Sequence, residues 1–206
     1  MKLRLCVYNP LSAGDKCPGR REQIFREMKA AHVVVLTGAK LRLGKNGSPD
    51  AGQGMDGFRL FNWGYGNGRA TNRHAGLTIG LSTSMFRASG VKQIISPPAM
   101  LQGRGGGLRI KTKKLDMLVI GIYPPPAVGP HAKWASSKVF EWAGKELGRA
   151  PERCATVLGG DLNAHVGLEK MVGGCVAKTQ ARGIGGCRRA LCNENWTADA
   201  GALSGW

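Results

Sequence analysis

The chain has 206 residues and a net charge of +17, from 30 lysines and arginines against 13 aspartates and glutamates. Its length predicts a single domain over residues 1–206 with a substantial core, and no apolar run is long enough to cross a membrane. So strong a positive charge favours a polyanionic partner, most commonly nucleic acid, or else a generally basic surface that aids solubility. The opening residues lack a signal peptide's apolar region and the six cysteines form no C-x-x-C pair. We therefore expect an intracellular protein, nuclear or cytoplasmic.

The first quarter of the chain predicts two strands around one helix. Residues 2–9 alternate apolar and polar side chains, which is typical of a half-buried strand. A helix is predicted over residues 20–31, because apolar residues recur at helical spacing opposite charged ones. The run His32–Leu36 predicts a strand covered on both faces. A polar, glycine-rich loop is expected over residues 44–57.

The middle of the chain predicts a meander of antiparallel strands. These strands are expected at residues 58–63, 75–82, 91–96, 107–113 and 115–123. The last one stops at Tyr123, because three prolines follow it. A helix over residues 131–147 and a strand over 152–159 come next. The segment 166–206 is glycine-rich and basic, and we assign no regular structure to it.

A carboxylate and an amide, Asp161 and Asn163, follow the last predicted strand at a spacing of two residues. Side chains in a strand repeat every second residue, so the two would project from one face. A carboxylate that takes a proton from water, beside an amide that holds a phosphate, is suited to hydrolysis. The alternative is an ordinary turn in which both side chains bond to nearby backbone.

Two sequence motifs, together with this pair of residues, resemble those of a known family. The string Gly160–Gly167 reads G-D-x-N-A-H-x-G after an apolar strand, and Ile120–Pro124 reads I-x-I-Y-P. With a first strand that ends in Asn9, this order resembles the endonuclease/exonuclease/phosphatase superfamily, in particular the endonuclease domains of non-LTR retrotransposons and the craniofacial-development-protein-like sequences. The resemblance implies an α/β fold of the α+β type: a four-layer sandwich of two mostly antiparallel sheets flanked by helices.

The resemblance also implies a hydrolytic site that uses Mg²⁺. By that resemblance, Asn9 and Asp161 would lie at the metal, and Asp161 would orient or deprotonate the attacking water. Tyr123 would donate to a phosphate oxygen, and Asn163 would help to position phosphate and water. Each residue also has a structural alternative, since Tyr123 suits an interface and Asn9 suits a turn before proline.

The sequence departs from the family pattern at two places. The second strand ends in Leu36-Thr37-Gly38, where the family has a metal-binding glutamate, and no closing Ser-Asp-His strand precedes Trp206. Because Mg²⁺ needs hard oxygen ligands, we expect weak activity or none. Asp15, Asp50 or Asp116 could substitute. The missing last strand suggests a fragment of a longer reading frame or a decayed copy of a mobile-element gene.

The sequence therefore leaves three hypotheses. The first is a divergent metal-dependent phosphodiesterase resembling DNA endonucleases, weakly active or inactive. The second is a non-catalytic nucleic-acid-binding domain of the same fold, and the third is a phosphatase of small or lipid phosphates. The candidate residues for contact with nucleic acid are Arg20, Arg21, Arg69, Lys111 and Lys113.

Overall fold

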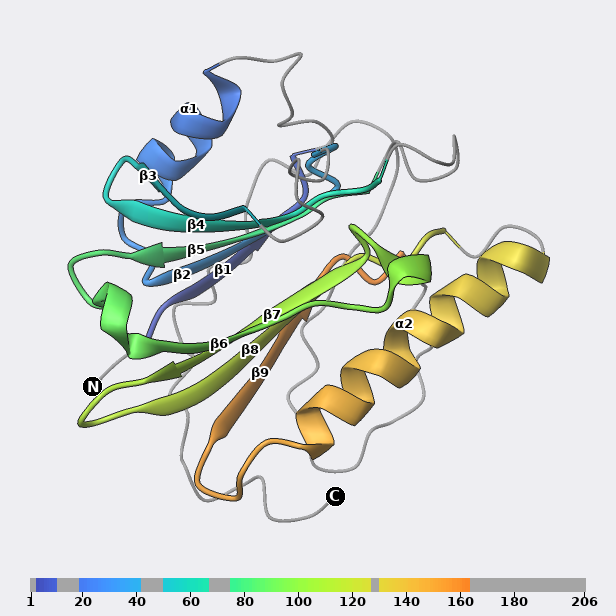
Figure 1. Ribbon diagram of the computed structural model, residues 1–206. Coiled ribbons are helices and arrows are strands. Elements are labelled where there is room, and N and C mark those ends of the chain that lie inside the picture. Colours follow the sequence, from blue (N-terminus) through green and yellow to red (C-terminus); the bar gives the residue numbers. More distant parts are fainter. Residues whose placement is uncertain (1–2, 11–18, 42–49, 67–74, 127–129, 164–206) are drawn as a thin grey trace, which may run out of the picture.

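The structure is a computed structural model that describes residues 3–10, 19–41, 50–66, 75–126 and 130–163. Two β-sheets pack face to face, and a helix covers the outer side of each, so that the molecule has four layers (Figure 1). The predicted α+β sandwich is confirmed. Within these ranges, no helix combines the length and the apolar character needed to cross a bilayer.

The first sheet is mixed. Its described strands lie in the order β1 (Leu5–Tyr8), β2 (Val33–Thr37), β5 (Leu77–Ser82), β4 (Phe58–Trp63) and β3 (Asp50–Met55). β1 and β2 are parallel, and the other neighbours are antiparallel. Helix α1 (Arg20–Glu27) returns the chain from β1 to β2 and buries Ile24 and Phe25.

Two sequence predictions in this sheet are wrong. The loop predicted over residues 44–57 contains β3, whose six residues, DAGQGM, lack apolar alternation but pair with β4 through a register shift between Ala51 and Gln53. The strand predicted over 75–82 is present and pairs antiparallel with β4, but the meander does not continue from it to the strand over 91–96, which belongs to the other sheet. The strand predicted over 75–82 is β5, which lies between β2 and β4.

The second sheet has the order β6 (Val91–Ile95), β7 (Gly105–Lys111), β8 (Asp116–Ile122) and β9 (Ala155–Gly160) in the described part of the chain. The first three form the predicted antiparallel meander, and β9 pairs with β8 in parallel. Short 3-10 helices, η2 (Ala88–Gly90) and η3 (Ala99–Leu101), lie on either side of β6 in the sequence. Helix α2 (Pro130–Gly148) makes the crossover between β8 and β9, and proline suits its first position.

Three apolar clusters hold the layers together. The largest lies between the sheets, where Val33, Val35 and Ile79 of the first sheet meet Leu108 and Val119 of the second. The second cluster joins α1 to the outer face of the first sheet. The third joins α2 to the outer face of the second sheet. Alternation along each strand therefore decides whether a side chain faces the other sheet or a helix.

Glycines at the start of β7 allow two tryptophans to approach the strand from opposite faces. A Cβ atom on Gly106 would collide with the Trp63 ring between the sheets. A Cβ atom on Gly105 would collide with the Trp142 ring of α2. The Gly105-Gly106-Gly107 run is thus a packing feature of a central strand and not a loop signal.

Candidate functional site

The strand registers bring three predicted site residues, together with Thr37, to one edge of the sandwich. Val7 and Val35, and Val119 and Val157 of the other sheet, pack in or against the cluster between the sheets. Counting every second residue from these valines toward the ends of the four strands leads to Asn9, Thr37, Tyr123 and Asp161. Because β1 runs parallel to β2 and β8 parallel to β9, the strand pairs end together. The ends of these four strands therefore meet at one edge of the sandwich.

Asp161 is held by hydrogen bonds on both of its oxygens. The side-chain nitrogen of Asn9 donates to Oδ2 at 2.6 Å, and the backbone N–H of Asn163 donates to Oδ1 at 3.1 Å. An ionised carboxylate only accepts, so the Asn9 atom that faces Asp161 is its amide nitrogen. A cation placed between Asn9 and Asp161 would have to displace this hydrogen bond.

Asn163 lies at the site but not on a strand. β9 ends at Gly160, and Asn163 has a left-handed backbone with φ of 45°. Its side-chain nitrogen donates to the carbonyl of Pro124 at 2.9 Å. The prediction that Asp161 and Asn163 extend from one face of a strand is therefore wrong, because the chain turns between them. The chain makes a turn here, in which Asp161 accepts from the Asn163 backbone, but the Asn163 side chain bonds to the distant Pro124 and so joins the end of β9 to the end of β8.

Gly38 lies between Asn9 and Tyr123. A Cβ atom at this position would lie 2.8 Å from Asn9 Oδ1 and 3.2 Å from the Tyr123 phenol oxygen. Gly38 also has φ of +62°, a conformation that side-chain-bearing residues adopt at a cost. The position at which the family resemblance implies a glutamate is thus at this edge, but its surroundings are shaped around glycine.

The described residues do not fit a divalent-cation site. Mg²⁺ is held by carboxylates, waters and substrate phosphates, yet no group of three His, Cys, Asp or Glu side chains in the described ranges could hold a metal ion. Of the three predicted substitutes, Asp116 begins β8, at the end opposite Tyr123, and its carboxylate binds Arg109 at 2.9 Å. Asp50 lies in β3, and Asp15 lies outside the described residues.

The structure adds Arg104, which the sequence reasoning missed. Arg104 immediately precedes β7 and is only 8% exposed. Its guanidinium carbon lies 5.3 Å from the centre of the Tyr123 ring, and its Nη1 donates to the Tyr123 carbonyl at 3.4 Å. The Tyr123 N–H donates to the Arg104 carbonyl at 2.8 Å. Burial lowers the pKa of Arg104 from its ordinary value, and interaction with Tyr123 partly opposes that shift.

The pairing of β7 with β8 is the signal that identifies Arg104. Gly105 pairs with Ile122 in the β7–β8 hairpin, so Arg104 comes directly opposite Tyr123. In the sequence, Arg104 is one of 30 basic residues, and it lies between the strands predicted over 91–96 and 107–113. The predicted strand began at Gly107, two residues after the observed start of β7.

Two of the predicted nucleic-acid residues, Lys111 and Lys113, lie at the opposite end of the second sheet from this edge. Lys111 ends β7, far from Arg104, and Lys113 is exposed in the turn that follows. Arg20 and Arg21 begin α1. Arg69 lies outside the described residues.

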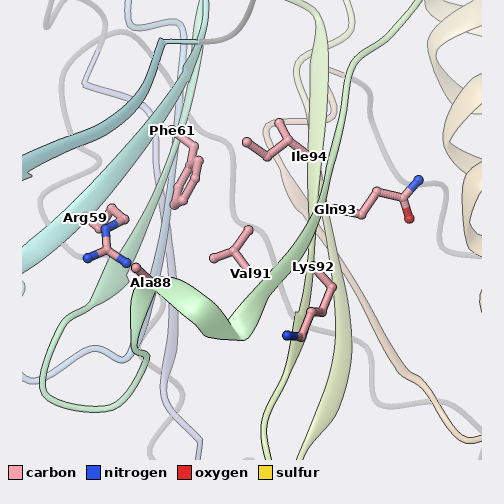
Figure 2. Close-up of a pocket in the computed structure, with 7 residues that line it drawn as sticks. All are labelled: Arg59, Phe61, Ala88, Val91, Lys92, Gln93 and Ile94. Atoms are coloured by element: carbon pink, nitrogen blue, oxygen red, sulfur yellow. The ribbon is translucent and has the colours of Figure 1, made fainter.

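A surface cavity of about 430 Å³ lies between β4 and β6, away from the predicted residues (Figure 2). Its lining consists of Arg59, Phe61, Ala88, Val91, Lys92, Gln93 and Ile94. It contains none of the residues that the sequence singled out.

Comparisons with known proteins show the fold. No family model and no curated protein matches the sequence. The AP endonuclease LMAP from Leishmania major is 13% identical over 77% of this chain and 54% of its own, with a TM-score of 0.53. A humanized TDP2 of D. rerio is 14% identical over 80% of this chain and 63% of its own, with a TM-score of 0.50.

A phosphatase has a similar structure. The mannosyl-6-phosphatase Bt3783 from Bacteroides thetaiotaomicron is 16% identical over 79% of this chain and 66% of its own, with a TM-score of 0.50. The chain thus spans between half and two thirds of the length of these proteins. The solved structures that resemble it include nucleases and phosphatases. The chain has the fold of the endonuclease/exonuclease/phosphatase superfamily.

Proposed function

We propose that this chain is a divergent, DNA endonuclease-like phosphodiesterase domain that binds nucleic acid and hydrolyses it weakly or not at all. The observation that carries the proposal is the arrangement around Gly38. Asn9, Tyr123, Asp161 and Asn163 meet at one edge, while the position expected to hold a metal-binding carboxylate is a glycine packed against Asn9 and Tyr123.

The chemistry of phosphodiester cleavage explains the expected weakness. The reaction needs an oriented water and donors that neutralise the charge developing on the phosphate. Asp161 could orient water, but each of its oxygens already accepts a hydrogen bond from the protein. Losing one donor or ligand commonly costs on the order of a hundredfold in rate. The described part of the chain offers no group of acidic or histidine side chains that would compensate.

The charge of the chain favours a polymer over a small phosphate ester. A net charge of +17 attracts a polyanion by releasing the counterions condensed on it. A single small phosphate would gain far less from charge spread over a whole surface. The fold shared with a mannosyl-6-phosphatase keeps small phosphate esters as the alternative substrate.

A plasmid assay tests this proposal. The full chain and its Asp161→Ala variant are incubated with supercoiled plasmid at low salt, with Mg²⁺ and separately with a chelator. We expect both proteins to retard the plasmid, retention to decrease as salt rises, and nicking to stay near the level without protein. Chelator-sensitive nicking that Asp161→Ala abolishes would contradict weak activity, and no retention at low salt would contradict DNA binding. Hydrolysis of a sugar phosphate without plasmid retention would favour the phosphatase alternative.

A further inference from the structure

The edge that contains Asp161 also contains buried hydrogen-bond donors. The Thr37 hydroxyl and the Trp63 indole N–H are buried and have no hydrogen-bond partner in the described part of the chain. The Arg104 guanidinium of the second sheet is also buried, and its hydrogen bond to the Tyr123 carbonyl is long at 3.4 Å. Buried polar groups in proteins are nearly always paired, so two exceptions on the strands that flank β5 need an explanation; a third unpaired atom in the described ranges, Arg21 Nε, lies in α1.

The registers place these donors on the same side of the two sheets. Thr37 and Trp63 both pair with Leu77, one from each side. Across the sandwich, Gly106 faces Trp63 and Gly121 faces Leu77. Arg104 lies two residues before Gly106, and therefore continues the face that looks toward the first sheet. The donors thus line the end of the space between the sheets.

Arg104 is also a buried positive charge without a carboxylate partner among the described residues. The ion pairs in these ranges are Arg109–Asp116, Lys111–Asp116, Lys138–Glu141 and Arg149–Glu146. A desolvated cation without an anion costs folding free energy, and the Tyr123 ring offsets this cost only in part. Binding of an anion would explain why a side chain that lowers stability in this way is buried here.

We propose that this edge binds a phosphate group directly, through the Arg104 guanidinium, and does so without a divalent cation. This inference rests on the proposed function and names the group that contacts the nucleic-acid backbone. The planar guanidinium presents two parallel donors that match two phosphate oxygens. Tyr123, whose ring lies against Arg104, fixes the direction of the guanidinium.

Arg104 supplies positive charge at an edge where the described residues do not fit a cation site. Where a metal would neutralise a phosphate, Asn9 instead donates to Asp161, and Gly38 supplies no ligand atom. The positive charge at this edge comes from the protein itself. The chain can therefore hold a phosphate where it is poorly equipped to cleave one.

The test measures binding of a fluorescent duplex oligonucleotide to the full chain by anisotropy, in EDTA and over a series of salt concentrations. Arg104→Met removes the charge and keeps much of the side-chain volume, whereas Arg104→Lys keeps the charge but loses the two parallel N–H donors of the guanidinium. The matched control is Arg87→Met, because Arg87 is exposed and precedes η2, at the end of β6 opposite the site. Thermal unfolding of each protein is recorded in the same buffer.

We expect Arg104→Met to weaken binding in EDTA about tenfold more than Arg87→Met does, the effect of one charge-assisted hydrogen bond. Arg104→Lys should keep most of the salt dependence and bind with intermediate affinity. Adding Mg²⁺ should change the affinity of the unmodified chain by less than about twofold beyond ordinary screening. Arg104→Met should also unfold at a higher temperature than the unmodified chain, because it removes an unpaired buried charge. A purely structural arginine would produce the opposite change in unfolding temperature.

Equal affinities of Arg104→Met and Arg87→Met would overturn the proposal and leave the proposed DNA binding intact. Binding that requires Mg²⁺ would also overturn it. An absence of DNA binding by the unmodified chain would instead refute the proposed function. In that case, thermal unfolding with inorganic phosphate in EDTA tests the phosphate site separately from DNA binding. Stabilisation of the unmodified chain but not of Arg104→Met would support a site for free phosphate. Stabilisation of neither protein would refute the phosphate site as well.

Discussion

Asn9 and Asp161, 152 residues apart in the sequence, are joined by a hydrogen bond of 2.6 Å from the Asn9 side-chain nitrogen to the Asp161 carboxylate. Asn9 follows β1 in the first sheet, and Asp161 follows β9 in the second. The bond therefore joins the two sheets at the edge where the predicted site residues meet. It also sets the orientation of the Asn9 amide and so determines which atoms this edge presents.

A double-mutant cycle measures this bond. Asn9→Ala, Asp161→Ala and the double variant should give a coupling of about 1–3 kcal/mol in the free energy of unfolding, because a carboxylate acceptor strengthens the bond. Urea denaturation of the four proteins provides the values. Additive effects, within about 0.5 kcal/mol, would show that the two side chains do not stabilise each other.

Replacing Gly38 by glutamate should not restore a nuclease site. Its backbone is left-handed, and a Cβ atom would approach Asn9 and Tyr123 closely, so Gly38→Glu should lower the free energy of unfolding by about 1–3 kcal/mol. Gly38→Ala, as the control, should account for most of this loss, since the cost begins at Cβ. Plasmid nicking should stay at the level of the unmodified chain. A Gly38→Glu protein of unchanged stability that nicks DNA with Mg²⁺ would refute our view of this position.

Gly106 should tolerate no side chain. A Cβ atom there would collide with the Trp63 ring, so Gly106→Ala should lower stability by about 1–3 kcal/mol through overpacking. Gly144→Ala is the matched control, because Gly144 is exposed in α2 with no neighbouring atom within 4 Å of an added Cβ. That change should raise stability by about 0.5–1 kcal/mol. Thermal and urea unfolding distinguish the two, and equal effects would rule out the close contact with Trp63.

Asp116 should make stability depend on pH in the acidic range. Its hydrogen bonds with Arg109, at 2.9 and 3.1 Å, hold its pKa below the ordinary value. The carboxylate thus contributes stability that is complete above its unfolded pKa, near 4, and is lost as pH falls through its folded pKa. Urea unfolding between pH 2 and 6 should show a steeper acid decline for the unmodified chain than for Asp116→Asn. Parallel curves for the two proteins would exclude this contribution.

The sequence was most informative where strands consist of apolar runs. The run of residues 32–36 and the apolar strand before Asp161 predicted β2 and β9, and their alternation carried through to Thr37 and Asp161. Helix α2 was found because its apolar spacing reflects the face that buries Val139, Trp142 and Ala143. The apolar spacing of these elements reflects the faces that they bury, two for β2 and one for α2.

The remaining features depend on pairing between distant residues. β3 has no apolar alternation and becomes a strand only through hydrogen bonds to β4. β5 could pair with either sheet, and only the tertiary arrangement places it between β2 and β4. Arg104 is important because the hairpin register sets it opposite Tyr123, which its own neighbours in the sequence do not reveal.

The central claim is that this edge binds nucleic acid and leaves it largely uncut. The most direct measurement follows a labelled duplex oligonucleotide with excess full chain at low salt and Mg²⁺, and resolves the bound and cleaved fractions of one sample. The account predicts a large bound fraction that falls steeply with added salt and a cleaved fraction near that without protein. Cleavage that a chelator stops, or no bound fraction at low salt, would contradict it.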